Sequence, residues 1–82
     1  MKLSQIILDQ IEKDFEEKDH TFVTDQLLTI TLSHVMANSE GLLESTRRSI
    51  LNLAQGDLKQ VEPLVQNAKT DFRDIIYWNS KK

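Results

Sequence analysis

The sequence has 82 residues, of which 39% are hydrophobic and 28% charged, and its formal net charge is −3. This length supports one domain, and two glycines with one proline are too few for the frequent turns of a sheet protein, so the composition favours helices. Cysteine is absent, which excludes disulfides, thiolate nucleophiles and cysteine-ligated metals.

The first segment is predicted to be an amphipathic helix over about residues 4–18. Its apolar residues recur at three- and four-residue steps, with charged residues between them, and they are Leu3, Ile7, Leu8, Ile11 and Phe15. Ser4 is a suitable N-cap for this helix. The pattern breaks near Lys18, where Asp19 or Thr21 can cap the segment that follows.

The second segment, residues 21–37, fits two patterns. Residues 28–33 alternate between apolar and hydroxyl side chains, as a half-buried strand does. The same segment also places apolar side chains on one face at helical spacing: Leu27, Leu28, Thr31, Leu32, Val35 and Met36. A strand would need a partner strand that no other stretch supplies. We therefore predict a helix, with the Thr and Ser hydroxyls facing water or bonding to the preceding turn, although the sequence leaves helix and strand both open for residues 27–33.

A third helix is predicted over residues 40–55, with Ser39 as its N-cap. Gly56 is suited to the left-handed position that ends a helix. The expected buried stripe consists of Leu42, Leu43, Thr46, Ile50, Leu53 and Ala54.

A fourth helix is predicted over residues 58–69. Asp57 is its expected N-cap, with Gln60 three residues later as the partner in a capping box. Its expected buried face is Leu58, Val61, Leu64, Val65 and Ala68. Pro63 lacks a backbone donor, so we expect a kink there or a first turn separate from the main helix.

A short last helix is predicted over residues 72–78, capped by Thr70 or Asp71. Three apolar residues at helical spacing are expected to close the core: Phe72, Ile75 and Ile76. Tyr77 and Trp78 can belong either to the core or to an interface with a partner. The predicted fold is a compact all-α single domain, a bundle of four to five short helices with no sheet.

Two stretches resemble a pattern found in small bacterial all-helical proteins. One is residues 49–58, which end in Gly56-Asp57-Leu58, and the other is residues 68–78, which contain an Asp-aromatic-Arg-Asp-hydrophobic turn. The resemblance covers about the C-terminal half of the chain. It implies a compact helical domain of bacterial origin and carries no known activity.

The sequence offers little for catalysis or metal binding. His20 and His34 are its only histidines, and neither forms an i, i+4 pair with another histidine. A weak metal site or small enzyme using His20 or His34 is one alternative, but a solvated turn histidine and a hydrogen-bonded core-edge histidine are the simpler interpretations. The acids near one side of the first helix are interpreted as a solvated face: Asp9, Glu12, Glu16 and Asp19. We expect no catalytic, cofactor-binding or metal-binding residue, and no enzyme activity.

Arg47 and Arg48 raise the alternative of a DNA-binding regulator, since two arginines on the second of two closely joined helices resemble a helix-turn-helix. The distribution of charge along the sequence argues against nucleic-acid binding. Residues 1–41 hold three bases and eight acids (3 − 8 = −5), and residues 42–82 hold seven bases and five acids (7 − 5 = +2). We expect Arg47 or Arg48 to pair instead with Glu44 or with an acid of the first helix.

The sequence therefore favours an interaction module that binds another protein or itself, with a homodimer as one form. The expected partner-binding residues are Phe72, Arg73, Tyr77 and Trp78. Arg73 lies between two acids and is expected to form a local ion pair. No signal-peptide core or membrane-spanning run is found, so we expect a soluble cytoplasmic protein without membrane contact.

Overall fold

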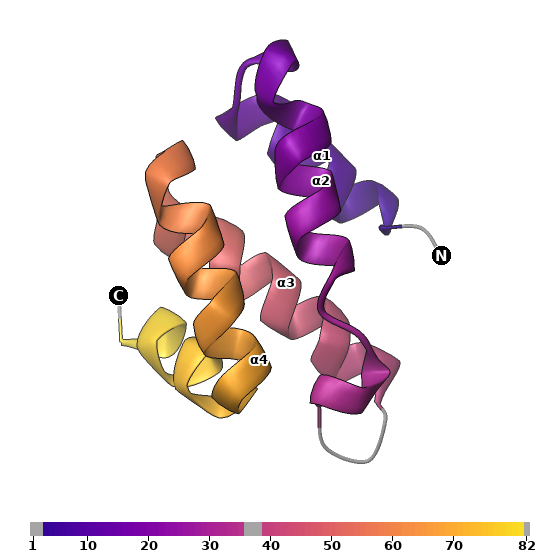
Figure 1. Cartoon of the computed structure of the whole chain (residues 1–82), viewed down its shortest axis with the longest axis vertical. Coiled ribbons are helices and arrows are strands. Elements are labelled where there is room, and N and C mark those ends of the chain that lie inside the picture. Colours follow the sequence, from indigo (N-terminus) through magenta and orange to yellow (C-terminus); the bar gives the residue numbers. More distant parts are fainter. Residues whose placement is uncertain (1–2, 36–38, 82) are drawn as a thin grey trace.

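Residues 3–35 and 39–81 are described in the computed structural model of the chain, and within them the regular structure is entirely helical (Figure 1). This confirms the all-α prediction. The elements, two of them short 3₁₀ turns, are α1 (Gln5–Asp14), η1 (Glu17–Asp19), α2 (His20–Leu28), η2 (Leu32–His34), α3 (Glu40–Ala54) and α4 (Leu58–Ser80). No helix in these two ranges is both long enough and apolar enough to cross a bilayer.

The helices enclose one apolar core to which all four contribute. α1 lies beside α2, and α3 packs most extensively against α4 (Figure 1). The largest fully buried apolar side chains are Ile7, Ile11, Val23, Leu27, Ile30, Ile50, Leu51, Val61, Val65 and Ile75. Burial of this apolar surface is the main source of stability in a domain of this size.

The first helix is shorter than predicted. It is capped as expected, since the Ser4 hydroxyl oxygen accepts a hydrogen bond from the Ile7 N–H at 3.3 Å. It ends at Asp14, because the backbone of Phe15 turns to an extended conformation that brings its ring into the core. The extension of this helix to residue 18 was therefore wrong. The freed carbonyl of Phe15 accepts a hydrogen bond from His20 Nε2 at 2.9 Å, which holds the following turn against the end of α1.

The single helix predicted over residues 21–37 was also wrong, and so was the strand alternative for residues 27–33. α2 ends at Leu28, and the Thr29 hydroxyl bonds back to the preceding turn as expected, donating to the carbonyl of Gln26 at 2.6 Å. The backbone is extended at Thr31, whose N–H donates to Nδ1 of His34 at 3.0 Å and so starts η2. Met36 lies outside the described residues.

α3 and α4 are joined by a turn in which two consecutive residues are left-handed, Gln55 (φ 51°) and Gly56 (φ 77°). Gly56 thus occupies the conformation predicted for it. A Cβ atom at this glycine would lie 2.9 Å from the carbonyl oxygen of Asp14, so the turn packs closely on the end of α1. Asp57 caps α4 as expected, since its Oδ1 accepts a hydrogen bond from the Lys59 N–H at 3.0 Å.

α4 consists of two helices that meet at Asp71, whose backbone is extended (φ −156°, ψ 98°). They cover residues 58–70 and 72–80, close to the two helices predicted there, and the second folds back beside the first in Figure 1. Asp71 caps this second segment, since its Oδ1 accepts a hydrogen bond from the Arg73 N–H at 3.1 Å. The backbone stays helical through Pro63, so the separate first turn expected there does not form.

Candidate functional site

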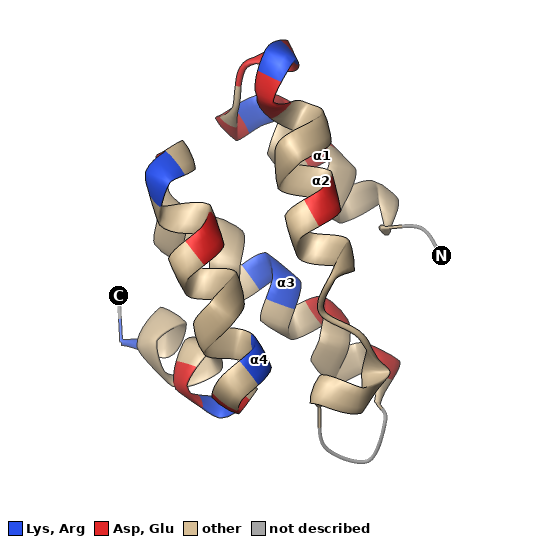
Figure 2. Ribbon diagram, in the orientation of Figure 1, with Lys and Arg blue, Asp and Glu red and all other residues tan. Residues whose placement is uncertain are grey.

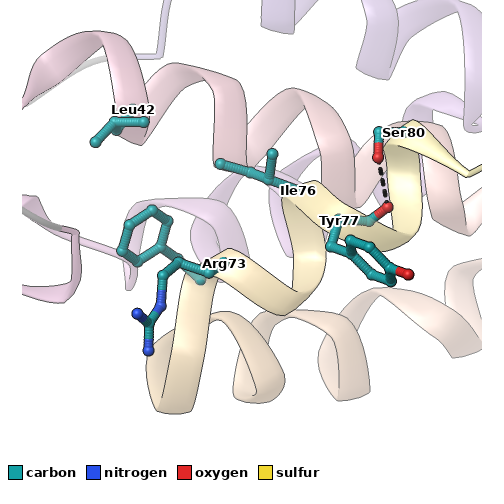
Figure 3. Close-up of a pocket in the computed structure, with 6 residues that line it drawn as sticks. Leu42, Arg73, Ile76, Tyr77 and Ser80 are labelled. Carbon is teal, nitrogen blue, oxygen red and sulfur yellow. Dashed lines mark hydrogen bonds between the residues drawn. The ribbon is translucent and has the colours of Figure 1, made fainter.

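An open apolar groove of about 510 Å³ runs between the start of α3 and the last helix, residues 72–80. One wall comes from α3 and the other from the last helix, as Figure 3 shows. The residues that line the groove are Leu42, Phe72, Arg73, Ile76, Tyr77 and Ser80. Apart from the arginine and the serine, these side chains offer carbon surface and one phenol.

The break at Asp71 sets the direction of the groove's second wall. Once the last helix has started, Phe72 and Ile75 are buried in the core and Ile76 is half-buried against it, which confirms the three predicted core contacts. Tyr77 comes next on the helix and is 58% exposed. Its carbonyl accepts a hydrogen bond from the Ser80 hydroxyl at 2.7 Å (Figure 3).

Three of the four residues predicted to bind a partner lie together in this groove: Phe72, Arg73 and Tyr77. The fourth, Trp78, is 41% exposed and is not one of the lining residues. Trp78 is therefore neither fully buried in the core nor fully exposed to solvent. Leu42 and Ser80 also line the groove, and the sequence had assigned Leu42 to the buried stripe of its helix.

Arg73 forms the local ion pair that the sequence indicated. Its Nε donates to Oδ1 of Asp71 at 3.0 Å, and its Nη2 donates to Oδ2 of the same carboxylate at 3.0 Å. Hydrogen bonding from Arg73 lowers the pKa of the Asp71 carboxyl, and the carboxylate in turn raises the pKa of Arg73. With its guanidinium held at Asp71, Arg73 contributes mainly its aliphatic stem to the groove.

A second, polar hollow of about 330 Å³ adjoins the groove and shares Ile76 and Ser80 with it. Its other lining residues are Ser45, Arg48, Ser49, Asn52 and Asn79. Asn79 Nδ2 donates to the hydroxyl oxygen of Ser49 at 3.3 Å, which ties the last helix to α3 at this point. Arg48 is exposed on the rim of the hollow.

Arg47 is placed differently from the prediction. It is buried, and instead of joining a surface ion pair it donates from Nε to the carbonyl of Leu27 at 3.1 Å and from Nη2 to that of Ile30 at 2.7 Å. Burial lowers the pKa of the Arg47 guanidinium, and the nearby charge of Glu44 opposes this shift. Figure 2 shows the Lys and Arg positions spread over several helices with acids between them. Arg47 therefore holds the end of α2 and is not available to a phosphate.

The two histidines both hold backbone groups. His20 bonds to the carbonyl of Phe15, and it lines a hollow with Glu12 and Glu17. His34 Nδ1 accepts from the Thr31 N–H, so it takes the place that Glu or Gln has in an ordinary capping box. Among residues 3–35 and 39–81, no three His, Asp or Glu side chains are grouped as metal ligands would be.

The resemblance of the C-terminal half to small bacterial helical proteins stays a prediction. No protein-family model, no curated protein and no solved structure matches this chain.

Proposed function

We propose that this chain is a non-catalytic protein-interaction module and that the apolar groove lined by Leu42, Phe72, Ile76 and Tyr77 is its docking surface. The observation that carries the proposal is the 58% exposure of Tyr77 in a groove that Leu42, Phe72 and Ile76 also line, with the Nζ of Lys81 5.4 Å from the centre of the tyrosine ring. Tyrosine combines a large apolar ring with a polar tip and is enriched at the centres of protein interfaces. Phe72 is buried and Ile76 half-buried in the core, whereas the Tyr77 ring stays largely in water.

Contacts with the rest of the domain also fix the position of the last helix, which forms one wall of the groove. Phe72 and Ile75 anchor the last helix in the core, and Asp71 caps its start. The bond from Asn79 to Ser49 fixes the other end to α3. A preformed wall loses little conformational freedom on binding, which favours affinity. Because the groove is open along its length, it suits a helix or side chain of another protein better than an enclosed small molecule.

Site-specific photo-cross-linking tests this function. A photoreactive phenylalanine analogue replaces Tyr77 in the protein made in its own cells, and we expect covalent adducts with a protein partner. The matched control places the same analogue at Gln66, an exposed position of α4 that does not line the groove, and we expect it to give no such adduct. Equal labelling from both positions, or none from Tyr77, would contradict the proposal.

A further inference from the structure

The apolar groove and the polar hollow beside it form one continuous surface between α3 and the last helix. Ile76 and Ser80 line both parts, whereas Leu42 lines only the groove and Arg48 only the hollow. Each part has one wall from α3 and one from the last helix. An occupant that covers both parts therefore meets carbon surface in the groove and a guanidinium in the hollow.

The charged groups at this surface are cations without an acidic partner. Among the described residues that line either part, none is Asp or Glu. Within residues 3–35 and 39–81, Arg48 has no acidic side chain at ion-pair distance. The same is true of Lys81, whose Nζ lies 5.4 Å from the centre of the Tyr77 ring. Both cations are exposed and can pair with an acid that a partner supplies.

Arg48 differs in this respect from the other two arginines of the chain. The guanidinium of Arg47 is buried against backbone carbonyls, and that of Arg73 is held by Asp71. Arg48 is exposed, and Ser45 lies one turn before it on the same side of α3 and lines the same hollow. A guanidinium with a hydroxyl beside it offers the planar set of donors that matches a carboxylate.

The carbon surface next to these cations indicates a peptide and not a nucleic acid. A phosphate backbone binds to rows of Lys and Arg side chains, and a nucleic acid would leave the apolar groove unfilled. Leu42 and Ile76 instead match the apolar side chains of a protein segment. The carboxylate that Arg48 can bind then belongs to the same segment.

We propose that the occupant of the groove is an acidic segment of another protein. An apolar side chain of that segment packs on Ile76 and Tyr77, and an Asp or Glu beside it binds Arg48 and Ser45 in the hollow. This inference rests on the proposed docking function of the groove and names the chemistry of its partner. It accounts together for the open apolar groove and for the unpaired cation next to it.

A charge swap between protein and peptide tests the proposal. Random peptides displayed on phage are selected on the wild type, and those that still bind Tyr77→Glu are discarded, because they do not use the groove. The remaining peptides are synthesised, and fluorescence anisotropy measures their affinity for wild type and Arg48→Glu. The matched control is Lys59→Glu, which reverses an exposed cation that lines neither part. Circular dichroism verifies that the variants are folded.

We expect the selected peptides to carry Asp or Glu next to apolar residues and to bind less tightly in high salt. Arg48→Glu should weaken their binding on the order of tenfold, because two like charges then face each other. Replacing the acid of the peptide by Lys should restore binding to Arg48→Glu and weaken binding to the wild type. Lys59→Glu should bind the original peptides as the wild type does.

Three results would overturn the inference: selected peptides without acids, equal binding by Arg48→Glu, or a Lys-containing peptide that fails to restore binding. Each of these leaves the docking function in place, since the peptides still require Tyr77. If no selected peptide requires Tyr77, the inference is lost, and cross-linking from Tyr77 decides the docking function separately. Sedimentation equilibrium adds one more outcome, because a wild type that dimerises and a monomeric Tyr77→Glu would assign the groove to a second copy of this chain and contradict the inference.

Discussion

Arg47 donates a hydrogen bond of 2.7 Å from Nη2 to the carbonyl oxygen of Ile30, a residue 17 positions earlier in the chain. Its Nε makes a second bond to the carbonyl of Leu27. These carbonyls lie at and just beyond the last turn of α2, and that of Leu27 also accepts a hydrogen bond from the Ile30 N–H at 3.2 Å. A buried cation and the negative end of a helix thus satisfy each other inside the core.

Replacing Arg47 should therefore destabilise the whole domain. Arg47→Ala leaves the two buried carbonyls without this donor, and we expect the free energy of unfolding to fall by about 2–3 kcal/mol, as measured by urea denaturation. Arg48→Ala is the matched control, since its side chain is exposed one position away, and it should change stability by less than about 0.5 kcal/mol. Equal free energies of unfolding for the two variants would show that the buried hydrogen bonds of Arg47 contribute nothing to stability.

The two glycines should respond oppositely to alanine. Gly56 is left-handed, and an added Cβ would lie 2.9 Å from the backbone oxygen of Asp14, so Gly56→Ala should cost about 1–3 kcal/mol. Gly41 lies within α3, and a Cβ there meets only the Ser39 hydroxyl at an ordinary 3.6 Å. Gly41→Ala should therefore stabilise by about 0.5–1 kcal/mol. Thermal melts compare the pair, and a stabilised Gly56→Ala would contradict the close approach to α1.

Acid should loosen the last helix before the rest of the domain. The pKa of Asp71 is lowered in the folded state by Arg73, so its contribution to stability is present above the ordinary Asp value of about 3.9 and is lost as pH falls through the lowered value. Emission from Trp78, the only tryptophan, reports this change over roughly pH 5 to 2. Asp71→Asn retains a capping oxygen but does not titrate, so its emission should change less. If the emission of Trp78 depended on pH in the same way in the wild type and in Asp71→Asn, titration of Asp71 would not be what loosens the last helix.

The hydrogen bonds fix the neutral tautomer of both histidines. Nδ1 of His34 accepts from the Thr31 N–H and must be unprotonated, so the proton lies on Nε2. At His20, Nε2 faces the carbonyl of Phe15, which can only accept, so Nε2 again carries the proton. Long-range nitrogen–proton NMR spectra at mildly alkaline pH should show the Nε2–H form for both rings. An Nδ1–H form at either residue would disprove the corresponding bond.

Local capping signals were enough to place most helix boundaries. Ser39, Asp57 and Asp71 each accept a hydrogen bond from a backbone N–H in the first turn of the helix that follows, as their residue types indicate. The end of α2 could not be predicted in this way, because the group that holds it, Arg47, belongs to another helix. His34 was equally hard to interpret, since it replaces the acidic or amide residue of a usual capping box.

The candidate site was only partly predictable. Phe72, Arg73 and Tyr77 attracted attention as an aromatic and charged cluster on one short helix. Leu42 is in the groove because of how the last helix lies along α3, and nothing in its local sequence separates it from its buried neighbour Leu43. Helix periodicity identifies an apolar stripe, but it does not show which edge of that stripe remains open to a partner.

The left-handed turn at Gln55 and Gly56 also bears on the order of folding. It joins the two helices that pack most extensively on each other with a very short loop, so little chain entropy is lost when they meet. We expect the α3–α4 pair to form first, with α1 docking afterwards as the carbonyl of Asp14 reaches Gly56. In kinetic terms, Ile50→Val should mainly slow folding and Ile7→Val should mainly speed unfolding. The short turn thus makes α3 and α4 the expected folding nucleus of the chain.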